Sequence, residues 1–178
     1  MSEEQAYLDE LLQNAVNAVY EEDRCLLHFS KGCKVGLEQA FVFRTGIHLS
    51  NLLQGTCYET LDLDSEYNKN HGNAKKSRRF PNGLRPDLII HRRDSNEENK
   101  LVVEFKGWWN NDINTDLKKL EDLTSPKEKY KYLIGVFVKI GKTKPTYRYF
   151  INGKEHLKEK ARSNEIISDN LVKTKINE

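Results

Sequence analysis

Two stretches of the chain decide its fold: Arg85-Pro86-Asp87-Leu88-Ile89-Ile90-His91-Arg92-Arg93 and Leu101-Val102-Val103-Glu104-Phe105-Lys106. Each has a block of aliphatic residues next to charged ones, which is typical of β-strands. The proline is expected near the start of its strand, because it cannot donate a hydrogen bond to a neighbouring strand. The polar, turn-rich residues 94–100 between the two stretches predict an antiparallel hairpin with a long loop.

Three ionisable side chains on this hairpin form a candidate catalytic site: Asp87, Glu104 and Lys106. Residues two apart in a strand point to the same side, so Glu104 and Lys106 share one face, while Phe105 points to the other and is expected to be buried. Pairing of the strands can bring Asp87 near Glu104. Adjacent carboxylates repel each other unless a cation lies between them, and Mg²⁺ prefers oxygen ligands. Lys106 would orient or deprotonate a metal-bound water, so the pattern indicates hydrolysis of phosphodiester bonds.

Helices are expected before and after this hairpin. Apolar residues at helical spacing predict a first helix over residues 2–20, with a sequence like a capping box at its start. A second helix after Gly36, with apolar residues from 37 to 53, is apolar nearly all round, which predicts that it lies against the sheet with the first helix packed outside it. The other expected elements are a strand at 58–63, a helix at 112–123, a buried strand at 132–140, an edge strand at 146–151, and a polar helix with a charged tail from residue 155.

The order of these elements and the spacing of the charged residues resemble the PD-(D/E)XK nuclease superfamily. Sixteen residues separate Asp87 from Glu104, which opens a Glu-x-Lys motif. The resemblance extends from about Leu37 to Ile140. It implies an α/β, restriction-endonuclease-like fold: an α-β-β-β-α-β core with a mixed central sheet flanked by helices, plus an extra N-terminal helix. Residues 86–93 also resemble uncharacterised bacterial members of the superfamily.

What the resemblance implies is a metal-dependent nuclease. Asp87 and Glu104 would bind Mg²⁺, with Phe105 as a further metal ligand and Mn²⁺ as a substitute ion. Lys106 would orient the attacking water. Glu38, near the start of the helix before the first core strand, matches the position from which members of the superfamily often supply an accessory catalytic carboxylate. Endonuclease and exonuclease activity both stay open, and the expected substrate is DNA rather than RNA.

A basic loop precedes the first of the two strands. Residues 69–79 hold five basic residues and no acidic one. The residues expected to bind nucleic acid are Lys75, Lys76, Arg78, Arg79 and Arg85. The other interpretation is a solvated loop over residues 68–83 that binds nothing. The first helix is acidic, so it is expected to avoid nucleic acid and to face a partner subunit, which leaves a homodimer open.

A second class of function stays open beside the enzyme. It is a non-catalytic nucleic-acid-binding module, or a subunit of a larger defence or repair complex, with the same fold and a metal site that is lost or needs a partner. Trp108 and Trp109 either stack on an unpaired base or close the core. Cys25, His28 and Cys33 lack the spacing and the fourth ligand of a common zinc site.

Length and composition indicate one soluble domain. The chain has 178 residues, of which 37% are hydrophobic and 31% charged, and a net charge of +2, which fits neither a disordered chain nor a membrane protein. We expect one nuclease-like domain, with an N-terminal helix and connector at 1–35, the core at 36–153, and a C-terminal helix and tail at 154–178. Three cysteines without CxxC spacing and no readable signal peptide favour a cytoplasmic protein with reduced thiols.

Overall fold

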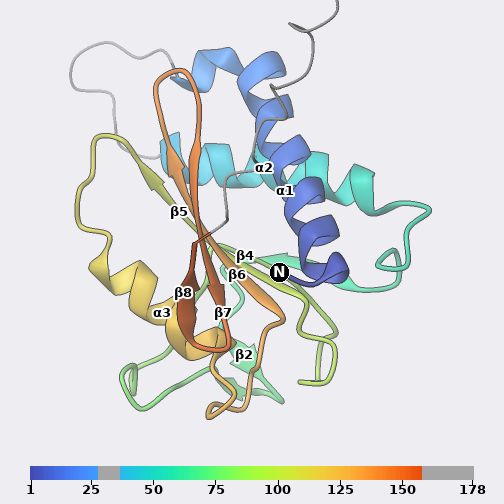
Figure 1. Ribbon diagram of the computed structural model, residues 1–178, viewed down its shortest axis with the longest axis vertical. Coiled ribbons are helices and arrows are strands. Elements are labelled where there is room, and N and C mark those ends of the chain that lie inside the picture. The colour runs from blue at the N-terminus through green and yellow to red at the C-terminus, as the bar shows by residue number, and fades with distance from the viewer. Residues whose placement is uncertain (28–36, 158–178) are drawn as a thin grey trace, which may run out of the picture.

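The computed structural model describes residues 1–27 and 37–157, which form helices on both sides of a central sheet (Figure 1). The helices in these residues are α1 (Glu3–Glu22), the short 3₁₀ helix η1 (Arg24–Leu27), α2 (Leu37–Leu53) and α3 (Asn114–Thr124). The strands are β1 (Asp62–Ser65), β2 (Lys69–Asn70), β3 (Asn73–Ala74), β4 (Leu88–His91), β5 (Leu101–Gly107), β6 (Ile134–Ile140), β7 (Thr146–Ile151) and β8 (Lys154–His156).

Six strands form one mixed sheet in the order β1-β4-β5-β6-β7-β8, and β2 and β3 form a separate hairpin. Strands β4 and β5 pair antiparallel, as the polar connection between them predicts. Strands β5 and β6 pair parallel, and the chain passes through α3 between them. The other neighbours in the large sheet are antiparallel. The expectation of an α/β protein with a mixed sheet flanked by helices is therefore confirmed.

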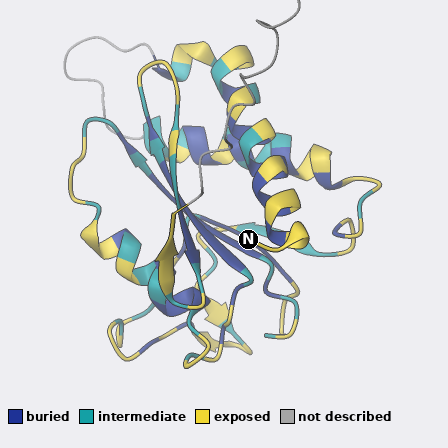
Figure 2. Ribbon diagram, in the orientation of Figure 1, coloured by how far each residue is buried: buried dark blue, intermediate teal, exposed yellow. Residues whose placement is uncertain are grey.

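Side chains alternate between the two faces of β4 and β5, and each face has its own hydrophobic core. Leu101, Val103 and Phe105 face α1 and α2 and belong to the larger cluster. Ile89 and Val102 face the opposite way and pack in a second cluster with α3. Figure 2 shows the central strands as the most buried part of the molecule. Glu104 has the same parity as Val102, so its carboxylate lies on the α3 side.

The first helix begins where the sequence indicates. Ser2 is the N-cap of α1, and its hydroxyl and the Gln5 side chain complete a capping box. The expected packing of this helix outside α2 is wrong, because α1 touches the sheet region directly. Gln5 donates to the Leu133 carbonyl, and the Tyr20 hydroxyl donates to the Gly141 carbonyl. Helices α1 and α2 therefore lie side by side on one face of the sheet. Phe43 of α2 is 66% exposed, so α2 has one side open to solvent.

Three other expectations are corrected by the structure. Residues 58–61 form turns, and the strand begins at residue 62 because two successive turns follow α2. Strand β7 is not at the edge of the sheet, since the tight turn at Asn152 and Gly153, both with positive φ, returns the chain as β8. Residues 155 and 156 therefore belong to a strand instead of a polar helix, and residues 158–178 lie outside the described part. No helix in the described residues is long and apolar enough to span a membrane.

Candidate active site

Asp87 and Glu104 lie opposite each other at the end of the β4–β5 ladder. Leu88 pairs with Val103, and continuing this antiparallel register by one residue sets Asp87 against Glu104 on the α3 side of the sheet. The backbone carbonyl of Asp87 accepts the Ser65 hydroxyl at 2.8 Å, which anchors the residue to the end of β1. The two carboxylates, which have sixteen residues between them in the sequence, are thus held on neighbouring strands.

The backbone of Phe105 is part of this site, while its side chain is in the core. The Phe105 N–H donates to the Asp87 carboxylate at 2.6 Å. Because the N–H and C=O of one strand residue point to the same side, the Phe105 carbonyl is also directed toward Asp87. The phenyl ring is fully buried and lies 6.2 Å from the ring of Phe41 on α2. Burial of Phe105 confirms the alternation expected from the sequence.

Both carboxylates have raised pKa values, because the site is buried and short of positive charge. Burial raises the pKa of Asp87 from 3.8 to about 6, although the Phe105 N–H and the Lys119 ammonium act in the opposite direction. Burial also raises the pKa of Glu104, which is 1% exposed, and the adjacent charge of Asp87 adds to this effect. A perturbed pair of carboxylates beside a surface pocket is a feature of functional sites.

Lys106 is held by carboxylates on two helices. Its ammonium lies 2.9 Å from Asp116 and 3.6 Å from Glu38. Glu38 also accepts the backbone N–H of Gly107 at 2.8 Å, so it is tied to the end of β5. Burial alone would lower the pKa of Lys106, but Asp116 and Glu38 outweigh it and the pKa is raised. The two carboxylates therefore favour the charged form of Lys106, and Lys139 lies opposite it on β6.

Helix α3 contributes two site residues that the sequence reasoning missed. The Lys119 ammonium lies 2.9 Å from Glu104 and 3.0 Å from Asp116. Asp116 thus binds both Lys106 and Lys119, and its side chain is 8% exposed. One signal was available: Asp116 is three residues before Lys119 and shares the inward side of the helix with Leu120. An acidic residue at such a position needs a partner across the interface.

The charge balance of the cluster leaves room for a divalent cation. Four carboxylates and two ammonium groups interact with one another here, which gives a formal charge of −2. These side chains are Glu38, Asp87, Glu104, Asp116, Lys106 and Lys119. The ammonium of Lys139, which interacts with Glu38 and Lys106 from β6, reduces this excess to −1. One oxygen of Glu104 is buried without a hydrogen-bond partner.

The donor set fits a Mg²⁺ ion that keeps several of its waters. Within residues 1–27 and 37–157, no three acidic, histidine or cysteine side chains are grouped closely enough to hold a metal by themselves. The carboxylates of Asp87 and Glu104 and the Phe105 carbonyl offer oxygen ligands, which this ion prefers, and water can complete its coordination. The unpartnered Glu104 oxygen is the observation that supports the fit.

A pocket of about 400 Å³ opens directly beside Asp87. Lys119 lines it from α3, and Arg85 and Glu66 line it from the segments around β4 and β1. Arg85 lies 3.1 Å from Glu66, and its side chain is 63% exposed. The remaining lining residues are Asn68, Asn82 and Gly83. The walls of the pocket therefore carry two cations, Lys119 and Arg85, and two carboxylates, Asp87 and Glu66.

The basic loop before β4 is packed instead of free. Lys75 is 2% exposed, donates to the Tyr132 hydroxyl at 2.9 Å, and has its ammonium 5.2 to 5.6 Å from the centres of three tyrosine rings. Its predicted role on a nucleic-acid-binding surface is corrected, because the side chain does not reach that surface. Burial lowers the pKa of Lys75 to about 8. The loop also contains the β2–β3 hairpin.

The other four basic residues expected to bind nucleic acid differ in their exposure and in their ion pairing. Arg79 is bound to Asp122 and Glu121 of α3, so its charge is neutralised within the protein. The side chains of Lys76 and Arg78 are exposed. Arg85 alone among the five expected residues lines the pocket next to Asp87. Of the five expected residues, Lys75 is thus buried and Arg79 is paired, while Lys76, Arg78 and Arg85 are exposed.

The tryptophans lie beside the site. Trp108 is half-buried against the larger hydrophobic cluster, and its ring centre lies 4.6 Å from that of Trp109. Trp109 covers Gly107, where an added Cβ would come within 2.3 Å of the indole. This packing agrees with the core-closing interpretation. Cys25 is a free, exposed thiol, and His28 and Cys33 lie outside the described residues.

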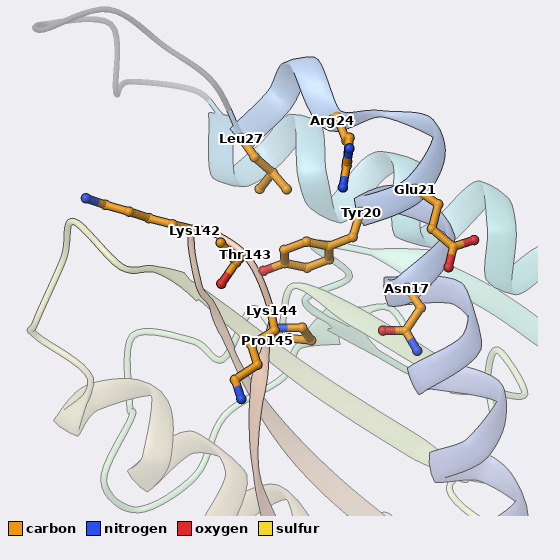
Figure 3. Close-up of a pocket in the computed structure, with 9 residues that line it drawn as sticks. All are labelled: Asn17, Tyr20, Glu21, Arg24, Leu27, Lys142, Thr143, Lys144 and Pro145. Atoms are coloured by element: carbon orange, nitrogen blue, oxygen red, sulfur yellow. The ribbon is translucent and has the colours of Figure 1, made fainter.

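A separate hollow of about 430 Å³ lies between the end of α1 and the β6–β7 turn (Figure 3). The Tyr20 ring lies in the middle of the lining residues in this view, and the Arg24 side chain points toward that ring. The ammonium groups of Lys142 and Lys144 point away from the ring in this view. None of the carboxylates of the candidate active site lines this hollow.

Comparisons of the chain with protein-family models, curated proteins and solved structures found no match.

Proposed function

We propose that this protein is a metal-dependent nuclease that hydrolyses phosphodiester bonds, with DNA as its substrate and a restriction-endonuclease-like core. The observation that carries the proposal is the pair Asp87 and Glu104, held opposite each other on antiparallel strands, with Lys106 two residues further on the same face. The surrounding cluster has more carboxylates than ammonium groups, and this excess of negative charge would favour a Mg²⁺ ion, for which Mn²⁺ would substitute.

The proposed roles follow from where each side chain lies. Asp87, Glu104 and the Phe105 carbonyl would hold the ion, which supplies Lewis-acid stabilisation of the charge that develops on a phosphate. Lys106 orients the attacking water as a cation, and its raised pKa makes it a poor base. Glu38 fixes Lys106 and the end of β5 and is therefore a positioning residue. Arg85 would bind a neighbouring phosphate at the pocket.

A cleavage assay on plasmid and single-stranded DNA tests this proposal. The parent should cut with Mg²⁺ or Mn²⁺ and stop when EDTA removes the ion. Lys106→Met should lower the rate by about 100-fold, the loss expected for a group that acts on the reacting water. Lys118→Met is the matched control, because Lys118 is an exposed lysine of the same helix as Lys119 and should leave the rate unchanged. Equal cutting by the parent and Lys106→Met would show that the site is wrong.

The ion pair between Lys119 and Glu104 favours a second candidate, a nucleic-acid-binding module without catalysis. In the described structure this lysine already neutralises the buried glutamate. Such a module would bind DNA with an affinity that falls steeply with salt, and would not cleave it. Salt-dependent DNA binding by a parent that shows no cleavage in Mg²⁺ or Mn²⁺ would select this candidate over the nuclease.

A further inference from the structure

We propose that Lys119 is an internal counter-ion that occupies the cation position beside Glu104, and that a divalent metal displaces it into the adjoining pocket, where it binds a substrate phosphate. This inference rests on the proposed nuclease function. It assigns Lys119 two positions, one in the metal-free protein and one in the metal-bound protein. The first position is the one that the described structure contains.

The geometry around Glu104 supports the first position. The Lys119 ammonium contacts one oxygen of this carboxylate at 2.9 Å, while the other oxygen is buried without a hydrogen-bond partner. A buried carboxylate with one bound and one unpartnered oxygen is incompletely neutralised. An ion bound by Asp87 and the unpartnered Glu104 oxygen would lie beside the Lys119 ammonium on the other oxygen, and repulsion between the two cations would disfavour the present position of the lysine.

The helix supplies a means to hold the lysine near the site after displacement. Lys119 is also bound to Asp116 at 3.0 Å, and Asp116 binds Lys106 through its second oxygen. Loss of the contact with Glu104 would therefore leave Lys119 with one acidic partner on its own helix. Its side chain is 19% exposed. Lysine has a flexible stem, so its ammonium can move several ångströms without any change in the helix.

The pocket beside Asp87 supplies the second position. Lys119 lines this pocket together with Arg85, Asn68 and Asn82, which offer charged and polar donors, and the carboxylates of Asp87 and Glu66 line it too. Arg85 is paired with Glu66 at 3.1 Å, so the pocket has no excess of positive charge while Lys119 is bound to Glu104. A phosphate group binds well where an ammonium and a guanidinium approach it from different elements. Released from Glu104, the Lys119 ammonium would be available to a phosphate in the pocket, opposite Arg85. The ligand class for the pocket is thus a phosphodiester group of the substrate strand.

Metal titration calorimetry on the parent, Lys119→Met and Lys118→Met tests the competition. Lys119→Met should bind Mn²⁺ at least about tenfold more tightly, because the ion no longer displaces a cation. Lys118→Met should change the affinity less than about twofold, because an exposed charge is screened by solvent and salt. In the absence of metal, Lys119→Met should unfold at a lower temperature than the parent, and saturating Mn²⁺ should remove this difference.

Amine acetylation followed by mass spectrometry tests the movement itself. Labelling of Lys119 should increase when Mn²⁺ is added, while labelling of Lys118 stays constant. A parent and a Lys119→Met variant that bind Mn²⁺ equally, or a Lys119 that is labelled equally with and without the ion, would overturn the inference while leaving the metal site intact. If neither protein binds Mn²⁺, both the inference and the proposed metal site are wrong.

Discussion

Replacing Asp87 by asparagine should stabilise the metal-free protein and abolish hydrolysis. The carboxylate of Asp87 is held in a buried cluster with an excess of negative charge. An asparagine has nearly the same shape, and its side-chain oxygen can still accept the Phe105 N–H. The variant therefore removes an unfavourable charge at little cost in packing. A residue that destabilises the fold in this way is expected where function, instead of stability, requires the charge.

The magnitude follows from the raised pKa of Asp87. The folded value of about 6 lies above the value of 3.8 for an unperturbed aspartate. The folded state then binds more protons than the unfolded state between these two values, so the stability falls as the pH rises through this window. The difference corresponds to about 3 kcal/mol once both states are ionised. About half of this cost should remain at about pH 5, and little of it near pH 4.

Urea denaturation of both proteins in EDTA at about pH 7.5 and about pH 5 measures the effect. Asp87→Asn should exceed the parent by about 3 kcal/mol at the higher pH, and by roughly half as much at the lower pH. Asp112→Asn is the matched control, because Asp112 is exposed and should give a difference near zero at both values. An Asp87→Asn variant that is less stable than the parent, or equally stable at both pH values, would refute the reasoning.

Three further predictions concern other parts of the structure. Glu38→Gln should lower the hydrolysis rate by about tenfold, or about 1.4 kcal/mol at the transition state, with DNA affinity unchanged in a binding assay. Gly107→Ala should lower the melting temperature and alter tryptophan fluorescence, because the added Cβ would overlap the Trp109 ring. Gly46→Ala is the control and should be tolerated, because its Cβ would lie 3.4 Å from its nearest neighbour. The pKa of Lys75 is lower in the folded protein than in the unfolded chain, so the stability of the parent should rise with pH. In chemical denaturation, the free energy of unfolding of the parent should increase by about 2 kcal/mol relative to that of Lys75→Met between about pH 7 and pH 10. A difference between the two proteins that does not change with pH would contradict the burial of Lys75 as a cation.

The hairpin of β4 and β5 was predictable because its information is local. A period of two in the side chains sets which residues face the core, and a polar segment between two apolar runs forces the chain to reverse. The same argument sets the parity of Glu104 and Lys106. It could not show that Asp87 accepts a backbone N–H from Phe105, because that bond depends on where β4 stops pairing.

The fate of the basic loop was not predictable from its charge. Lys75 and Arg79 look alike in a run of cations, yet one lies among tyrosine rings and the other pairs with α3. Tyr130 and Tyr132, which surround Lys75, follow it by more than fifty residues. A charge run predicts solvent exposure only while no distant segment supplies partners for it.

The sequence by itself determined the alternation of side chains along the strands, the capped first helix and the reversal between β4 and β5. It also determined that Glu104 and Lys106 lie on the same face of their strand. These features depend on neighbours within a few residues, where backbone geometry fixes the direction of each side chain. Only the tertiary structure decided that Asp116 and Lys119 complete the charge cluster, and that α1 lies beside α2. Those contacts join segments far apart in the chain, and their energy depends on burial and distance, which no local pattern contains.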